Sequence, residues 1–160
     1  MRPLPRVVTP DTAWTPPPGA TTPASRISST SVRIVDGDSL ELGAQRIRLD
    51  GIDALELSQT CRDARGGTIP CGRRARDALE ALVRGGRVDC VGAATDRYGR
   101  LLARCMTARG IEINRTLVRE GWALAYPGDA TYAAEERAAA AERRGIHAWQ
   151  FVRPEAWRRG

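Results

Sequence analysis

The stretch that decides the fold is VDGDSLELGAQRIRLDGIDALE, residues 35–56. Apolar and polar residues alternate on both sides of the Asp-Gly-Asp at residues 36–38, and the alternation continues in RIRLDGI, residues 46–52. A period of two is typical of half-buried strands, and Asp-Gly is a strong signal for a tight turn. With SVRIV at residues 31–35, the stretch predicts three strands joined as a β-meander.

Helical and strand patterns then follow in turn along the chain. Residues 73–86 carry apolar side chains at the spacing of one helical face and end in two glycines. A hairpin is expected around the DRYG turn at residues 96–99, then a short amphipathic helix in residues 113–121 and a longer helix in residues 131–145. Strands that come first, with helices interleaved and last, predict an α+β domain rather than a parallel βαβ fold.

Length and composition fit one folded domain, expected over residues 31–153. The chain has 160 residues, of which 42% are apolar and 28% charged, as in an ordinary soluble core. Residues 1–30 hold seven of the ten prolines and little apolar periodicity, so we expect a disordered tail or linker there, and a basic tail in residues 154–160. No apolar run approaches the ~20 residues that cross a bilayer, so we expect no contact with a membrane.

The charge and the histidine count narrow the chemistry. A net charge of +6 and a pI near 9.9 favour a polyanionic partner, because neutralising phosphates releases counterions. The chain has no lysine, so the arginine-rich composition of a GC-rich genome is an alternative source of this charge. His147 is the only histidine, which excludes multi-histidine metal sites and disfavours a catalytic triad. The chemistry is therefore expected to rest on carboxylates, arginines and a hard metal ion.

Four short segments resemble the motifs of the staphylococcal thermonuclease family, in the same order and with similar spacing. They are VDGDSLEL (35–42), RIRLDGIDALE (46–56), DRYGRLLA (96–103) and NRTLVREGWA (114–123). The resemblance covers roughly residues 32–149 and implies an OB-type five-stranded β-barrel with three α-helices. Barrels of this type bind oligonucleotides across one face.

The resemblance also implies a metal site. Asp38 and Asp53 would bind Ca²⁺ together with the backbone carbonyl of Ala54. Calcium is a hard ion that takes oxygen ligands, and two aspartates on different strand ends would hold it from rigid supports.

Three further side chains are implied as catalytic. Glu56 would activate a metal-bound water that attacks phosphorus, while Arg48 and Arg100 would grip the scissile phosphate and stabilise charge in the transition state. Each candidate has a structural alternative, as a turn former, a strand ion pair or a hairpin charge. The joint presence of all five side chains that the family mechanism needs favours the catalytic interpretation.

One departure from the family pattern concerns the segment before the glutamate. The family commonly has a proline there, whereas this chain has Ala54-Leu55 and so loses the stiffening that a proline gives. The carbonyl of Ala54 survives the change, but the placement of Glu56 is expected to be looser.

Nucleic-acid contacts are expected from the DRYG turn and from a tyrosine near residue 126. Arg97 stands where the family often has a lysine beside the tyrosine, here Tyr98, and Tyr126 is a counterpart of a tyrosine that contacts substrate, with Tyr132 a weaker match. An exposed tyrosine can stack on a base, and the alternative is a half-buried tyrosine that packs a helix.

The four cysteines allow three pairings. If the first and last residues of the DRYG turn lie opposite each other, Cys90 lies opposite Cys105, and Cys61 would then pair with Cys71. Two disulfides predict an oxidising compartment and hence export to the periplasm or medium, with a signal not present in this chain. Four reduced cysteines are the alternative, and zinc is less favoured because no histidine lies near.

The sequence therefore predicts a calcium-dependent nuclease that hydrolyses DNA and RNA with little sequence specificity and acts as a monomer. The resemblance implies 3′-phosphate products. The alternative is a non-catalytic nucleic-acid-binding OB module, and a weaker one is a protein-interaction barrel whose charge is only compositional.

Overall fold

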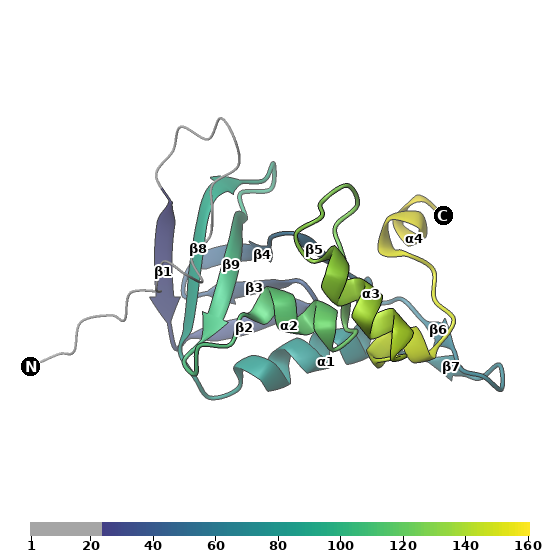
Figure 1. Cartoon of the computed structure of the whole chain (residues 1–160). Coiled ribbons are helices and arrows are strands. Elements are labelled where there is room, and N and C mark those ends of the chain that lie inside the picture. The colour runs from purple at the N-terminus through teal and green to yellow at the C-terminus, as the bar shows by residue number, and fades with distance from the viewer. Residues whose placement is uncertain (1–23) are drawn as a thin grey trace, which may run out of the picture.

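The computed structural model describes residues 24–160, which fold as a curled mixed β-sheet with helices packed below and beside it (Figure 1). The strands are β1 (Ser25–Ser29), β2 (Val32–Asp36), β3 (Ser39–Leu42), β4 (Gln45–Leu49), β5 (Ile52–Ala54), β6 (Cys61–Arg62), β7 (Thr68–Ile69), β8 (Val88–Thr95), β9 (Leu101–Thr107) and β10 (Ala123–Ala125). The helices are α1 (Cys71–Val83), α2 (Ile113–Arg119), α3 (Ala133–Ala141), the 3₁₀ turn η2 (Gly145–Ala148) and α4 (Pro154–Arg159).

The main sheet has six strands in the order β1-β8-β9-β4-β3-β2. Neighbours are antiparallel except β4 and β9, which pair in parallel from Ile47 opposite Leu101 onward, so the sheet is mixed. The α+β class is confirmed, but this curled six-stranded sheet differs from the five-stranded barrel that we expected. Two more pairs, β5 with β10 and β6 with β7, stand apart from it.

Both predicted tails need correction. Strand β1 lies within residues 1–30 and pairs with β8, from Ser25 opposite Gly92 to Ser29 opposite Val88. The sequence SRISS contains a single apolar residue, so it shows no alternation, and its pairing depends on the neighbouring strand. Residues 154–159, expected to be a basic tail, form α4. The rest of the N-terminal prediction, residues 1–23, lies outside the described residues.

The meander of β2, β3 and β4 is confirmed, but RIRLDGI does not continue as one strand. The chain turns after β4 at Gly51, whose φ is 79°. A Cβ there would lie 2.9 Å from the ring of Tyr132, so the close packing also requires glycine. After this turn β5 leaves the main sheet and pairs with β10, which places Asp53 opposite Leu124.

The core lies between the sheet and the helices. Helix α1 buries Ala75, Leu79 and Val83, the apolar face predicted from its spacing, against the inner side of the sheet. A second, smaller cluster gathers Leu55 and Ile146 around the Cys61–Cys71 bridge. Within the described part of the chain, no helix has the length and apolar character needed to cross a membrane.

Both predicted disulfides are confirmed. Cys90 and Cys105 lie directly opposite each other on β8 and β9, with Cα atoms 4.1 Å apart. Cys61 in β6 is joined to Cys71 at the start of α1, with Cα atoms 5.7 Å apart. Two disulfides indicate an oxidising compartment.

Candidate active site

A cleft of about 620 Å³ lies between the meander, the turn that joins β8 to β9, the segment after β10, and α4. Residues from all four parts line it, although they are far apart in the sequence. Of the predicted site residues, the cleft is lined by Asp38, Arg48, Asp53, Glu56, Arg97, Tyr98, Arg100 and Tyr126. Ala54 lies just beneath, buried in β5. The structure thus brings together the side chains that the resemblance selected.

The turn between β2 and β3 directs Asp38 into the cleft. The carboxylate of Asp36 accepts hydrogen bonds from the backbone N–H of Asp38 at 3.2 Å and from the hydroxyl of Ser39 at 2.6 Å, which closes the turn. A Cβ on Gly37 would lie 2.8 Å from that of Ala54, so only glycine allows β5 to come this close. Asp36 therefore acts as the turn former, and Asp38 is left to face the cleft.

Arg48 is held against the two buried aspartates. Its Nη2 atom lies 3.4 Å from Oδ2 of Asp38 and 3.4 Å from Oδ1 of Asp53. Its Nη1 atom donates to the carbonyls of Leu49 and Ile52 at 2.8 and 3.0 Å. Only 13% of the side chain is exposed, so Arg48 is a fixed part of the wall of the cleft.

The two aspartates differ in how well their charge is compensated. Asp53 is 1% exposed and faces two arginines, Arg48 and Arg158. Asp38 is 7% exposed, and burial raises its pKa to about 8, although Arg48 and the N–H of Ala54 act in the opposite direction. The charge of Asp38 is therefore less well compensated than that of Asp53.

This donor set fits a hard cation. The carboxylates of Asp38 and Asp53 converge on one point, the Nη2 atom of Arg48, and carboxylate oxygens are the ligands that calcium prefers. The residues that the structure describes contain no group of three or more His, Cys, Asp or Glu side chains arranged to hold a metal. Since Ca²⁺ takes six to eight oxygens, backbone carbonyls and water would have to complete the site.

Arg158, which the sequence analysis missed, makes direct contact with the carboxylates. Its Nη1 donates to Oε1 of Glu56 at 2.6 Å and to Oδ1 of Asp53 at 3.3 Å, and its Nη2 donates to Oδ2 of Asp53 at 3.0 Å. The hydrogen bond to Asp53 is the main reason that the pKa of Arg158 is raised above its usual value. The signal for α4 was present in the sequence, as Pro154 at the first turn and Arg158 in the last.

Buried packing, rather than proline, holds the segment of Glu56. Leu55 is 1% exposed and belongs to the second apolar cluster. The side chain of Gln59 accepts the N–H of Glu56 at 3.1 Å, and the N–H of Gln59 donates back to the carbonyl of Glu56 at 2.8 Å. Gly72 in α1 packs so closely that a Cβ there would lie 1.8 Å from that carbonyl oxygen. These contacts indicate that Glu56 is held firmly, in contrast to the looser placement expected from the missing proline.

The turn between β8 and β9 forms the opposite rim. Arg100 donates from Nε to Oδ2 of Asp96 at 2.7 Å. Burial by itself would raise the pKa of Asp96, but hydrogen bonds from Arg100 and Tyr98 outweigh burial and lower this pKa. The pair therefore stays ionic. Tyr98 is 54% exposed, and its ring lies 4.9 Å from the guanidinium carbon of Arg97 and 5.5 Å from that of Arg100. This arrangement presents an aromatic face between two cations.

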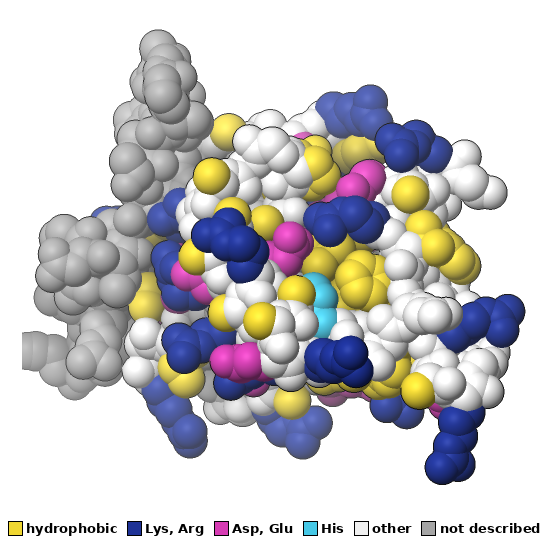
Figure 2. All heavy atoms as spheres, turned by 45° about the vertical axis from the view of Figure 1, so that its right-hand side comes forward, with side chains coloured by type: hydrophobic (Ala, Val, Ile, Leu, Met, Phe, Trp, Pro, Cys, Tyr) yellow, Lys and Arg dark blue, Asp and Glu magenta, His cyan; other side chains and the backbone are white. Residues whose placement is uncertain are grey.

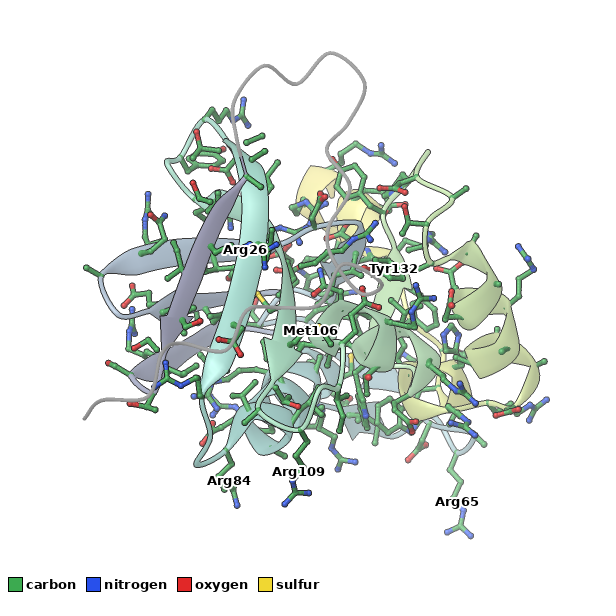
Figure 3. The ribbon with its side chains drawn as sticks, turned by 60° about the vertical axis from the view of Figure 1, so that its left-hand side comes forward. Arg26, Arg65, Arg84, Met106, Arg109 and Tyr132 are labelled. Carbon is green, nitrogen blue, oxygen red and sulfur yellow. A yellow bond between two sulfur atoms is a disulfide. The ribbon has the colours of Figure 1, made fainter. Side chains whose placement is uncertain are left out.

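The two tyrosines after β10 have different environments. Tyr126 is 50% exposed at the rim of the cleft, and its N–H donates to the carbonyl of Gly51 at 2.9 Å. Tyr132, which is labelled in Figure 3, is fully buried. Its hydroxyl donates to Glu112 at 3.1 Å. The weaker match of Tyr132 to a substrate contact is therefore wrong, because its ring packs in the core against Gly51.

Comparison with known proteins identifies the family. The model of the staphylococcal nuclease homologue family matches residues 46–150. The chain belongs to this family. The match contains Arg48, Asp53, Glu56 and Arg100, whereas Asp38 lies before it and α4 after it.

Three relatives illustrate how this member of the nuclease-homologue family compares. It is 35% identical over 116 residues to the succinoglycan biosynthesis protein ExoI of Rhizobium meliloti, which is 71% of this chain and 61% of ExoI. It is 36% identical over 99 residues to an uncharacterized endonuclease of Escherichia coli, covering 59% of this chain and 58% of that protein. Endonuclease YhcR of Bacillus subtilis is 35% identical over 103 residues, covering 59% of this chain and 8% of YhcR. The chain thus spans about three fifths of the first two relatives.

Proposed function

We propose that this chain is a calcium-dependent nuclease that hydrolyses the phosphodiester bonds of DNA and RNA with little sequence specificity. The observation that carries the proposal is the convergence of Asp38, Asp53 and Glu56 with Arg48 and Arg100 in one cleft. Family membership and relatives named as endonucleases support it.

Each side chain has a role that its position allows. Glu56 takes the proton of a water molecule as the water oxygen forms a bond to phosphorus. The bond from phosphorus to the 5′-oxygen breaks, and this oxygen takes up a proton from solvent, which leaves a 3′-phosphate and a 5′-hydroxyl. Arg48 and Arg100 bind the phosphoryl oxygens, whose charge increases during the attack. Calcium held by Asp38, Asp53 and the carbonyl of Ala54 would add positive charge beside these oxygens.

The rims of the cleft suit a single strand of any sequence. Tyr98 and Tyr126, both about half exposed, offer rings on which bases can stack, and Arg97 beside Tyr98 can contact phosphate. Stacking tolerates every base, which agrees with low sequence specificity. Figure 2 shows arginines spread over the visible face rather than gathered in one block, so the cleft and not the overall charge would select the substrate.

The cell compartment is part of the proposal. The two disulfides favour export to the periplasm or the medium, where the protein acts as a monomer. The bridge from Cys61 to Cys71 ties the segment after Glu56 to α1, so oxidation would also secure the site.

One observation favours the alternative function, a nucleic-acid-binding module without catalysis. Arg158 neutralises both Glu56 and Asp53, the side chains that catalysis needs to be free. A nuclease must release this contact, whereas a binding module need not.

Degradation of supercoiled plasmid, with calcium or with excess EGTA, separates the two functions. The proposal expects cleavage in calcium and none in EGTA. Salt-sensitive DNA binding without cleavage in calcium would favour the binding module, and full cleavage in EGTA would overturn the metal assignment.

A further inference from the structure

The contact between α4 and the carboxylates joins the two side chains that the proposed reaction uses most directly. Arg158 donates to both oxygens of Asp53 and to one oxygen of Glu56. A cation bound by Asp53 requires lone pairs of the same oxygens. Arg158 and a divalent cation would therefore exclude each other at Asp53, at least in part.

Helix α4 is docked, so Arg158 is kept close to the site. Pro154 at its start is buried. The side-chain amide of Gln59 donates to the carbonyl of Val152 just before the helix. Arg153 pairs with Glu136 of α3 at 3.4 Å. None of these contacts involves the guanidinium of Arg158, so its side chain can turn without breaking them.

Of the two arginines at Asp53, Arg158 is the one that can leave. Its side chain is 44% exposed, against 13% for Arg48. Arg48 also donates to two backbone carbonyls, which would lose their partners if it moved. Arg158 gives up only its carboxylate contacts and regains water, and a cation bound in its place would keep the buried Asp53 compensated.

We propose that Arg158 is a tethered counter-ion that competes with calcium for Asp53 and so sets the calcium affinity of the site. The inference rests on the calcium site proposed above and concerns a residue outside the range that the family model matches. Because the two equilibria are linked, weakening the hold of Arg158 strengthens calcium binding by up to the same factor.

The test is the calcium dissociation constant of the whole chain, measured by titration calorimetry for the wild type and three variants. Arg158→Gln removes the charge and should bind calcium on the order of tenfold more tightly. Arg158→Lys keeps the charge but loses the forked contact with Asp53, so its calcium affinity should lie between those of the wild type and Arg158→Gln. Arg159→Gln is the matched control, because Arg159 is exposed on the same helix and has no ion pair among the described residues. It should bind calcium as the wild type does.

A second readout is the melting temperature at equal calcium concentrations. Calcium should raise the melting temperature of Arg158→Gln more than that of the wild type, because stabilisation by a ligand grows as its dissociation constant falls. If Arg158→Gln failed to fold, as judged by circular dichroism, Arg158→Ala, which also lacks the positive charge, would replace it. The rise of its melting temperature with calcium would then be compared with that of Arg158→Lys.

The outcomes separate this inference from the proposed function. Equal calcium affinity in the wild type and Arg158→Gln, with calcium-dependent cleavage intact, would overturn the inference alone. Calcium affinity in Arg158→Lys as high as in Arg158→Gln would also overturn it, since charge would then not be the cause. No calcium binding in any variant would remove the calcium site and the inference with it.

Discussion

Oδ2 of Asp38 accepts a hydrogen bond of 2.7 Å from the backbone N–H of Ala54. The bond joins the turn before β3 to β5, so the two aspartates of the proposed metal site are held on one rigid frame. Because the acceptor is the carboxylate itself, the contact also favours its charged form, although burial outweighs it and raises the pKa of Asp38.

Asp38→Asn should lose calcium binding by at least about tenfold with little loss of stability. An amide oxygen can still accept the N–H of Ala54, but a neutral ligand binds calcium more weakly than a carboxylate. Asp53→Asn should lose calcium binding and also stability, since it leaves the 13%-exposed Arg48 less well compensated. Calorimetry with thermal unfolding measures both effects. Unchanged calcium affinity in Asp38→Asn would show that the metal lies elsewhere.

Arg100→Ala should lower the turnover rate by about a hundredfold or more while changing substrate affinity little, if Arg100 binds charge that develops in the transition state. Arg100→Lys should rescue little, because an ammonium cannot form the bidentate contact. Initial rates over a range of DNA concentrations give the two parameters. Arg109, which points away from the protein body (Figure 3), is the control, and its alanine variant should change only salt-dependent affinity, slightly.

Arg48→Ala should lower the rate as steeply as Arg100→Ala but also destabilise the fold. The loss of stability is expected because the substitution leaves Asp38 and Asp53 without the guanidinium that lies between them. Thermal unfolding in EGTA measures the loss. Wild-type stability in Arg48→Ala would contradict the structural role given to this residue.

Gly72→Ala should displace Glu56 and lower the turnover rate, by up to about a hundredfold for a shift near 1 Å. The added Cβ would lie 1.8 Å from the carbonyl oxygen of Glu56, so one of the two must move. Gly86→Ala is the matched control, since its Cβ would meet only the Cβ of Ala108, at 4.0 Å. Equal rates in both variants would mean that the position of Glu56 is not critical.

Replacing Cys90 and Cys105 together by serine should destabilise the fold by about 2 to 4 kcal/mol. The loss should appear in denaturant unfolding and leave the cleft intact, since both cysteines are buried in the core away from it. Replacing Cys61 and Cys71 should lower activity as well, because that bridge anchors the segment after Glu56. Non-reducing peptide mapping should recover the same two pairs, and other pairings or free thiols would contradict the assignment.

The pairing of Cys90 with Cys105 shows what can and cannot be predicted from a turn motif alone. Next to the turn Thr95 pairs with Leu101, one residue away from the register assumed from the DRYG turn. An irregularity between Val91 and Ala94 restores the assumed register before Cys90. The pairing was therefore predicted correctly, although two compensating features in the strands could not be seen in the sequence.

The site was predictable where its residues lie in contiguous motifs, and not where tertiary contacts decide. Asp38, Asp53 and Glu56 were found because the meander that carries them has a clear period and resembles a known family. Arg158 belongs to a short basic segment with no motif, and its contact with Glu56 bridges residues far apart in the chain. Strand β1 was missed for the same reason, because its pairing depends on β8.

The most direct test of the account is the single-turnover cleavage rate of a DNA duplex by the wild type and by Glu56→Gln, in saturating calcium. We predict that Glu56→Gln binds calcium and DNA nearly as well as the wild type, yet cuts at least about a hundredfold more slowly, because an amide cannot accept the proton of the attacking water. Cleavage by Glu56→Gln at the wild-type rate would contradict the role of Glu56 as general base, and with it the proposed mechanism.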